Sequence, residues 1–408
     1  DKYYGAPMFK ISSSNSDLSD ITTLIADAPR ESFDVEVEDT SELYIGQKIV
    51  FWLSNNKEQI TDYLEGHDIG AEWQLDNGMT IREIHTVKAI DGTKVTLREP
   101  LHISLKQSYG VRVRSIVMLE NVGVEDIKFL GNWPSYGEDF IHHKVVNGVK
   151  DNIHDYGWTA LRMERVHNGW VKNVEFKDFS QCLFVRSSSA VTISDVLISG
   201  KKSHTSINIS ESYGVLVKDS QDTAGHHHGP GVAQRNTGAV YLRYKMADGQ
   251  NIDSHGGGPY VSLYDNLGKG HFDKNGGAHS AYPHHLKYFV FWNFELEGGP
   301  STYNFWRPHD RNGHTFLQPY FIGLHGKTAT FTADTFAVNE SPGIKVYPDS
   351  LFEAQLGLRL LPDYKYCCQA GTDLAVAVSA GPCMANKSPE VTMSRGMIKN
   401  KSYTIASR

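Results

Sequence analysis

The residues best suited to chemistry gather between His204 and His309, a stretch that contains ten of the nineteen histidines in the chain. Four of them recur at nearly equal intervals along the sequence: His204, His228, His255 and His279. A polar side chain that recurs once in every short repeat is typical of a strand solenoid that stacks one type of side chain on one face. Since imidazoles titrate near neutral pH, such a column could exchange protons with a substrate.

Aspartates in the same stretch could supply the two carboxyl groups that hydrolysis of a glycosidic bond requires. Asp222, Asp248 and Asp273 are almost equally spaced, and Asp253 and Asp273 precede glycine-rich turns. Turns of a strand solenoid stack about 4.8 Å apart. Carboxylates on neighbouring turns would therefore match retaining glycosidases, and carboxylates two turns apart would match inverting ones. The predicted catalytic residues are Asp253, Asp273, His255, His228 and Asp222.

Basic and aromatic side chains in the same window could hold an acidic sugar. Arginine binds sulfate or carboxylate groups through two hydrogen bonds, and lysine offers them a compact positive charge. Aromatic side chains combine a large apolar ring with, in tyrosine, a polar group, and such rings could stack on sugars. The predicted substrate-binding residues are Arg235, Arg243, Lys245, Tyr241, His279, His285 and Arg307.

Two other chemistries stay open. In a polysaccharide lyase, a cation neutralises a uronate carboxylate and a side chain removes the C5 proton, which His228 or His255 with Tyr241 and Arg243 could do. Alternatively, His226–His228 with His255 and nearby aspartates could bind a transition-metal ion. Consecutive side chains on a strand point in opposite directions, so three adjacent histidines cannot all meet one ion. No metal site is therefore predicted.

Structural explanations compete with each of these assignments. A single histidine could be an ordinary stacked surface residue, and a single aspartate could cap a turn by accepting backbone hydrogen bonds. A non-catalytic carbohydrate-binding β-helix is a further alternative. A pure binding module needs no crowded titratable groups, so the histidine-rich stretch favours an enzyme over that alternative.

The composition excludes several classes of protein. A net charge of −7 over 408 residues argues against a general nucleic-acid binder. No apolar run approaches the roughly 20 residues that a membrane-spanning helix needs. Cys182 lies in a strand-like run and is expected to be a buried free thiol, whereas Cys367 or Cys368 could pair with Cys383. Because the sequence starts at Asp1 without methionine or signal peptide, we expect a mature secreted or periplasmic protein, monomeric in solution.

The order of strand patterns predicts an all-β fold. Residues 1–108 contain a leader and a β-rich module with an Asp91-Gly92 hairpin signal. From residue 109 a repeat follows, seen in VGVEDIKFLG, GWVKNVEFKD, AVTISDVLIS and YGVLVKDSQD. Each segment alternates apolar and polar residues around one Asn or Asp. The first gap between these corner residues is about twice the later ones, so it is expected to span two turns. The four aligned residues are Asp126, Asn173, Asp195 and Asp219.

This short and regular pitch, with Asn or Asp at a corner, resembles the right-handed parallel β-helix of pectate-lyase-like proteins. That superfamily contains polysaccharide lyases, polygalacturonase-like hydrolases and carrageenan- or fucan-degrading enzymes. The phrases YPHHLKYFVFWNFE at 282–295 and SLFEAQLGLRL at 350–360 further resemble a β-helix domain family of polysaccharide-degrading bacteria. The polygalacturonase motif set is not present in order, and the Lys/Arg and Glu pattern of chondroitinase-B-like lyases is not evident, so no residue role is transferred from either family. Calcium is the ion that this resemblance suggests, although the sequence contains no readable oxygen cage.

The sequence therefore predicts a right-handed parallel β-helix over 109–345, preceded by a β cap over 1–108. Residues 346–408 are expected to form a C-terminal cap, with a helix over 351–360. The expected function is an endo-acting glycoside hydrolase that cleaves an anionic polysaccharide, with a sulfated fucan- or carrageenan-like polymer favoured by the resemblance. A polysaccharide lyase acting on a uronic-acid polymer is the alternative.

Overall fold

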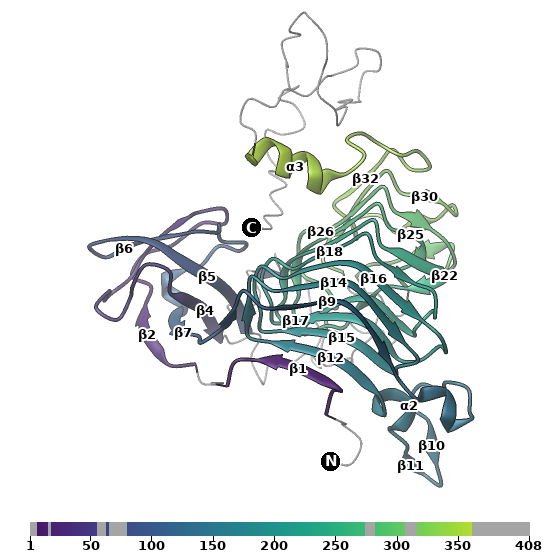
Figure 1. The fold of residues 1–408 in the computed structure, drawn as a ribbon. Coiled ribbons are helices and arrows are strands. Elements are labelled where there is room, and N and C mark those ends of the chain that lie inside the picture. Colours follow the sequence, from purple (N-terminus) through teal and green to yellow (C-terminus); the bar gives the residue numbers. More distant parts are fainter. Residues whose placement is uncertain are drawn as a thin grey trace, which may run out of the picture.

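A computed structural model describes residues 6–14, 18–54, 63–64, 80–273, 282–306 and 316–360. It confirms the all-β prediction, because successive strands stack in parallel as a solenoid and an antiparallel sheet lies beside it (Figure 1). One long face of the solenoid is a parallel sheet made of β1 (Phe9–Ser12), β12 (Thr159–Glu164), β15 (Gln181–Arg186), β17 (Thr205–Ser210), β20 (His228–Ala233) and β23 (Asp253–Ser254).

The rest of the solenoid wall is a second, larger parallel sheet. Some of its strands are short, because glycines and β-bulges interrupt the pairing between them. Its members in chain order are β9 (Gly123–Leu130), β14 (Trp170–Lys177), β16 (Thr192–Ser199), β18 (Leu216–Lys218), β19 (Gln221–Asp222), β21 (Thr237–Leu242), β22 (Lys245–Asn251), β24 (Tyr260–Asp265), β25 (Gly268–His271), β26 (Phe289–Trp292), β27 (Glu295–Leu296), β29 (Tyr320–Ile322), β30 (His325–Gly326) and β32 (Val338–Glu340). Two small pairs complete it: β8 (Leu119–Glu120) with β13 (Val166–His167), and β28 (Thr302–Tyr303) with β31 (Thr330–Phe331).

The register confirms a short and regular pitch. Leu161 pairs with Leu183, Leu183 with Ile207, and Ile207 with Pro230, so each pair joins equivalent places on neighbouring turns. The aligned Asn and Asp residues of the repeat all have positive φ: Asp126 (56°), Asn173 (51°), Asp195 (56°) and Asp219 (51°). Asn and Asp tolerate this left-handed conformation better than other residues with a side chain, so the chain can bend at the same place on each turn.

The inside of the solenoid is an apolar core with an aromatic ladder. Tyr241, Tyr264, Phe291 and Phe321 pair in register from one turn to the next. Consecutive rings of this ladder stack with centroids 5.0, 5.6 and 5.0 Å apart. Cys182 is a buried free thiol in the same core, as predicted.

The N-terminal module is an antiparallel sheet. Its strand order is β2 (Asp20–Thr23), β7 (Arg112–Ser115), β4 (Lys48–Ser54), β5 (Thr80–Asp91), β6 (Lys94–Leu97) and β3 (Asp34–Glu36), and the short 3-10 helix η2 (Gln107–Tyr109) precedes β7. The predicted hairpin at Asp91-Gly92 joins β5 and β6. A second apolar core forms where this module covers the outer face of the solenoid, and it includes Leu53, Val113, Val240 and Leu263.

Between β9 and β12 the chain leaves the repeat and makes an excursion over residues 131–158. It contains the 3-10 helix η3 (Trp133–Tyr136), the hairpin β10 (Val145–Val146) and β11 (Val149–Lys150), and the short helix α2 (Ile153–Tyr156). Figure 1 shows this excursion at one corner of the solenoid, away from the N-terminal module. It is anchored by Trp133, which is buried and donates from Nε1 to the carbonyl of Lys202.

Helix α3 (Leu351–Leu360) follows the last turn and matches the predicted bounds of 351–360. Its first turn is held by Asp265, whose Oδ2 accepts hydrogen bonds from Ser350 Oγ and the Phe352 amide. Within the described residues, no helix has the length and apolar character to cross a membrane. Cys367, Cys368 and Cys383 lie outside the described residues, so their predicted pairing stays a prediction.

Candidate active site

Three histidines from successive turns meet at the first ends of the strands of the β12–β23 sheet. His204 immediately precedes β17, His228 begins β20, and His255 follows β23. The ring centroids of His204 and His228 are 4.8 Å apart, and those of His228 and His255 are 5.1 Å apart. The column expected from the spacing of these three residues is therefore present. His279, the fourth member, lies outside the described residues.

The excursion closes over this column and adds residues that the sequence analysis missed. The ring of His142 stacks on His143, His227 and His204, with centroids 3.7, 4.3 and 5.2 Å apart respectively. Asp155, in α2, contributes a carboxylate that is 0% exposed. The adjacent pair His142-His143 was a signal in the sequence, but it lies far from the repeat that drew attention to His204–His309. We call His142, His143, Asp155, His204, His227, His228, Asp253 and His255 the histidine cluster.

Asp253 joins two of these imidazoles. Its Oδ1 lies 3.2 Å from His228 Nδ1 and its Oδ2 lies 3.1 Å from His255 Nδ1, while its side chain is 2% exposed. Burial raises the pKa of Asp253, but the two histidines outweigh burial and lower that pKa well below its usual range. The His255 side chain is 42% exposed, so it is the member of this trio that a substrate can reach.

Asp155 plays the same part on the other side of the cluster. Its Oδ1 lies 3.0 Å from His142 Nδ1, and its Oδ2 accepts a hydrogen bond from the His143 amide at 3.2 Å. The backbone carbonyl of Asp155 accepts from His204 Nδ1 at 2.9 Å. Burial raises the pKa of Asp155, but the hydrogen bond and charge of His142 lower it below the usual value. One residue of the excursion thus fixes the orientation of two imidazoles.

Two imidazoles of the cluster, His204 and His227, have pKa values below the usual range. Burial lowers the pKa of His204 well below its usual range, and the neighbouring His228, His142 and His227 lower it further. Burial, with the charges of His228 and His142, lowers the pKa of His227 to about 3. Neutral imidazole is the form that binds metal ions and accepts protons.

Three sets of side chains in the cluster could each hold a metal ion. Within each set, one possible ligand atom per residue lies within 4.8 Å of the others. The sets, drawn from the described residues, are His142 with His204 and His228, His142 with His143 and Asp155, and His228 with Asp253 and His255. Most of these donors are nitrogen atoms, which suit transition metals, whereas calcium prefers oxygen ligands.

A polar hollow of about 450 Å³ adjoins the cluster. Its walls include His227 and His228 from the cluster and the side chains of Lys202, Gln250 and Asp273. Amide, carboxylate and ammonium groups of this kind can hydrogen-bond sugar hydroxyls and acidic groups. The predicted catalytic residue Asp273 is therefore placed beside the cluster, whereas Asp253 lies beneath its imidazoles.

Three predicted site residues lie in the interior instead. Tyr241 is fully buried in the aromatic ladder and donates from its hydroxyl to the carbonyl of Gly231 at 2.7 Å. His285 is fully buried, with Nε2 3.0 Å from Ser262 Oγ. Asp222 is 0% exposed and accepts hydrogen bonds from the Ala224 and Gly225 amides at a turn. These positions correct the expectation that the three side chains meet a substrate, since each has its polar atoms engaged inside the protein.

The predicted basic residues lie apart from the cluster. Arg235 pairs with Glu211, which follows β17, so it lies near the opposite end of the strands from His204. Arg243 pairs with Asp219 and with Glu353 of α3, and Lys245 is exposed at the start of β22. Asp248, which is almost equally spaced from Asp222 and Asp273, is 72% exposed, pairs with Lys269 and lines the polar hollow together with Asp273. Arg307 lies outside the described residues.

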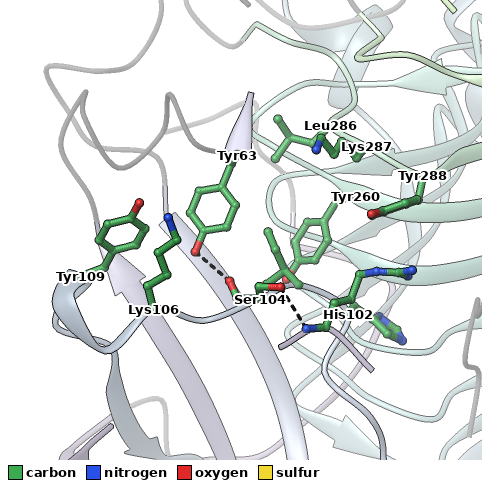
Figure 2. A pocket seen from close by; sticks show the side chains of 11 residues that line it. Tyr63, His102, Ser104, Lys106, Tyr109, Tyr260, Leu286, Lys287 and Tyr288 are labelled. Carbon is green, nitrogen blue, oxygen red and sulfur yellow. Dashed lines mark hydrogen bonds between the residues drawn. The ribbon is translucent and has the colours of Figure 1, made fainter. Parts of the chain in front are cut away.

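A second hollow, of about 400 Å³, lies between the N-terminal module and the solenoid (Figure 2). Its lining combines cationic and aromatic side chains: Arg30, Tyr63, His102, Lys106, Tyr109, Tyr260, Lys287 and Tyr288. The guanidinium of Arg30 lies 4.2 Å from the Tyr288 ring centroid, and the ammonium of Lys106 lies 5.3 Å from that of Tyr109. Burial and the charge of Arg30 lower the pKa of Lys287 to about 8. We call this hollow the cationic pocket.

One family model matches part of the chain. Residues 225–365 match the model described as Domain of unknown function (DUF4955), and no curated protein matches the chain. This match includes His227, His228, Asp253 and His255. The excursion precedes the matched residues in the sequence, so the cluster extends beyond the family model.

Among solved structures, three phage tailspikes are similar in fold. The tailspike of Acinetobacter baumannii bacteriophage AP22, solved with a capsular saccharide, aligns over 81% of this chain and 64% of its own with 10% identity and a TM-score of 0.31. The tailspike of Pseudomonas phage phi297 aligns over 80% and 49% with 12% identity and a TM-score of 0.36. That of Pseudomonas phage LKA1 aligns over 81% and 61% with 10% identity and a TM-score of 0.27. The chain thus spans about half to two thirds of these proteins.

Proposed function

We propose that this protein cleaves an anionic polysaccharide by β-elimination, with the histidine cluster as its reaction centre. The observation that carries the proposal is the trio of His228, Asp253 and His255, in which one buried carboxylate orients two imidazoles. His255 is the exposed imidazole of the trio, and the carboxylate at its Nδ1 leaves Nε2 to face a substrate. An imidazole oriented by a buried carboxylate is a general base in many enzymes.

The reaction needs one base, one source of positive charge and a proton for the leaving group. His255 would remove the C5 proton of a uronate residue. The electron pair of that C–H bond forms the C4–C5 double bond as the C4–O bond breaks, and the departing oxygen takes a proton from a neighbouring group or water. Lys202, beside His227 in the adjoining hollow, would supply positive charge to the substrate carboxylate.

The burial and the low pKa values of two predicted catalytic carboxyl groups favour elimination over hydrolysis by a pair of carboxylates. A glycosidase needs one carboxyl group that stays protonated as an acid and a second that reaches the sugar. Asp253 and Asp222 are 2% and 0% exposed, and their histidine partners hold the pKa of each below its usual value despite burial. Neither has the access or the proton that an acid catalyst requires. Asp248 and Asp273, which both line the adjoining hollow, are the carboxylates on which hydrolysis would depend.

The cationic pocket supports an acidic substrate. Its lining brings together the cations of Arg30, Lys106 and Lys287 with the rings of Tyr109 and Tyr288, in a chain whose net charge is −7. Cations concentrated on an otherwise acidic protein attract anionic groups locally, and aromatic rings offer faces for sugars. The pocket and the trio border the same turn, because Asp253 and Tyr260 flank Gly256–Gly258.

A product assay tests the proposal. The protein is incubated with pectate, alginate, ulvan, a sulfated fucan and a carrageenan, while reducing ends and the ultraviolet absorbance of unsaturated uronates are followed together. We expect both to rise in parallel on one uronic-acid polymer. Reducing ends that rise without this absorbance would overturn elimination and point to hydrolysis through Asp248 and Asp273. Binding without any cleavage product would leave the protein as a carbohydrate-binding module.

A further inference from the structure

We propose that His142, His204 and His228 bind a divalent transition-metal ion, with Zn²⁺ as the representative. The three residues come from three separate segments, namely the excursion, the turn before β17 and the start of β20. One ring nitrogen from each lies within 4.8 Å of the others. His204 and His228 are buried, and the His142 side chain is 28% exposed, so the site has one open side. Three histidines with an open fourth position are the ligand set of catalytic zinc sites.

The spacing of the three rings matches a tetrahedral centre. With zinc–nitrogen bonds of about 2.0–2.1 Å and each ring centroid roughly 1.1 Å beyond its ligating nitrogen, tetrahedral geometry places the centroids about 5 Å apart. The observed centroid separations are 5.2 Å for His142 and His204, 4.8 Å for His204 and His228, and 5.3 Å for His142 and His228. Packed rings can have similar separations, so the distinguishing feature is that one ring nitrogen from each of the three histidines lies within 4.8 Å of the others.

Each of these imidazoles also has the second contact that metal-binding histidines make. His142 Nδ1 lies 3.0 Å from Asp155 Oδ1, His204 Nδ1 lies 2.9 Å from the Asp155 carbonyl, and His228 Nδ1 lies 3.2 Å from Asp253 Oδ1. In metal sites the ring nitrogen that does not bind the ion typically donates to a carboxylate or a backbone carbonyl. This arrangement fixes the tautomer in each ring and leaves Nε2 for the ion.

Charge balance favours a cation at this place. Asp155 and Asp253 are 0% and 2% exposed and contact the proposed ligands His142 and His228. A buried carboxylate is costly unless a cation or hydrogen-bond donors offset its charge. A divalent ion between them would neutralise that charge. Nitrogen ligands select zinc, copper, nickel or iron over calcium and magnesium.

The inference rests on the proposed function only for its catalytic consequence. An ion bound by His228 would lie beside the trio that contains His255, because the rings of these two histidines are 5.1 Å apart. It would thus place positive charge where the substrate carboxylate of an elimination reaction must be neutralised, in addition to Lys202. The binding of the ion itself depends only on the geometry of the three histidines.

The test measures metal binding without any substrate. The whole chain is freed of metal with a chelator and titrated with Zn²⁺ by calorimetry, and the bound metal is then counted after gel filtration. We expect one tightly bound equivalent in the native protein and a loss of affinity of about 100-fold or more in His142→Ala and His204→Ala. His325→Gln, a histidine of β30 on the same solenoid, is the matched control and should bind like the native protein. Circular dichroism and thermal unfolding report whether each variant is folded.

Co²⁺ spectra distinguish the loss of a metal ligand from the misfolding of a variant. Co²⁺ added to the native protein should give the intense visible bands of a four-coordinate nitrogen site, and the His142→Gln variant should lose them while keeping the native melting curve. No bound Zn²⁺ in the native protein, or unchanged binding in both alanine variants, would overturn the inference. If the protein binds Zn²⁺ but still cleaves the polymer after full chelation, the metal site is supported and the ion has no part in the reaction. Cleavage without Zn²⁺ binding would retain the proposed function alone.

Discussion

His228 and Asp253 lie on adjacent turns of the solenoid, and His228 Nδ1 is 3.2 Å from Asp253 Oδ1. The other oxygen of the same carboxylate holds His255 at 3.1 Å. This carboxylate is 2% exposed. Its two oxygens contact the buried ring of His228 and the partly exposed ring of His255, and these contacts fix the orientation of both rings. The spacing of the repeat therefore aligns a buried anion on one turn with a histidine on the turn before it.

Asp253→Asn should disturb orientation while keeping the shape of the site. An amide cannot accept two imidazole N–H groups as a carboxylate does, so one ring loses its preferred tautomer. We expect cleavage to fall by about 100-fold or more, and the affinity for Zn²⁺ to fall about 10- to 100-fold. Initial rates on the responsive polysaccharide and a Zn²⁺ titration check these two effects. A variant with native rates and native affinity would show that Asp253 is only a buried structural residue.

Tyr241→Phe tests the interior position of that tyrosine. The substitution removes a hydrogen bond of 2.7 Å to the Gly231 carbonyl and keeps the stacked ring. We expect a loss of about 1 to 2 kcal/mol in the free energy of unfolding, because a buried carbonyl loses its donor. The KM for polysaccharide should not change. A raised KM with unchanged stability would instead support contact between Tyr241 and substrate.

Ionised Glu211 stabilises the folded protein, and this contribution is lost at low pH. Burial raises the pKa of Glu211, but the hydrogen bond from Arg186 and the charges of Arg82 and Arg235 outweigh it and lower the pKa to about 2. A group whose pKa is depressed by folding stabilises the folded state above its ordinary pKa of 4.5 and loses this contribution as the pH falls towards 2. The shift corresponds to roughly 3 kcal/mol for a group that is 8% exposed.

The Glu211→Gln variant provides the matched comparison. Chemical unfolding of the native protein at pH 7 and at pH 3 should show a steep loss of stability, and the variant should be less stable at pH 7 and less sensitive to acid. Arg82 belongs to β5 of the N-terminal module, so this ion pair also joins the module to the solenoid. Equal acid sensitivity in the two proteins would contradict the assignment to Glu211.

Lys106→Ala tests the cationic pocket. The ammonium of Lys106 lies over the Tyr109 ring at the wall of this pocket, and its removal should weaken the attraction for acidic sugars. We expect KM to rise several-fold, with kcat little changed and with a weaker dependence of KM on salt. Lys94→Ala, which breaks an exposed pair with Asp34 in the N-terminal module, is the control. Identical KM values for the two variants would show that the cationic pocket does not contribute to substrate binding.

The fold was predictable because the pattern of apolar and corner residues recurs at a nearly constant interval in the sequence. Alternating apolar residues and the corner residues Asp126, Asn173, Asp195 and Asp219 gave the pitch of the later turns. The interpretation of the first gap as two turns is wrong, because β9 pairs directly with β14 and the excursion enlarges a single turn. The near-equal spacing brought the rings of His204, His228 and His255 into contact. Their places are not strictly equivalent, because His228 pairs with Thr205 in the strand register. Helix α3 was readable from a local apolar pattern that ends before Pro362.

The rest of the site could not be read from periodicity. His142 and Asp155 belong to an excursion outside the repeat, and nothing in their spacing says against which turn it folds. Tyr241 was misplaced because β21 is buried on both faces, with Tyr241 in the inner core and Val240 and Leu242 beneath the N-terminal module. A strand covered on both sides shows no alternation between apolar and polar residues, so the sequence does not reveal which side chains point outwards.

The most direct test of the account follows the formation of unsaturated uronate by the native protein, His255→Ala and His325→Gln on the same polymer. His255 is the proposed base and the partly exposed imidazole of the trio, and its removal should lower the initial rate of the ultraviolet signal by about 100-fold or more. The His325→Gln control should keep the native rate, and both variants should show native circular dichroism. A His255→Ala variant that forms unsaturated product at the native rate would contradict the central claim that this imidazole takes the proton.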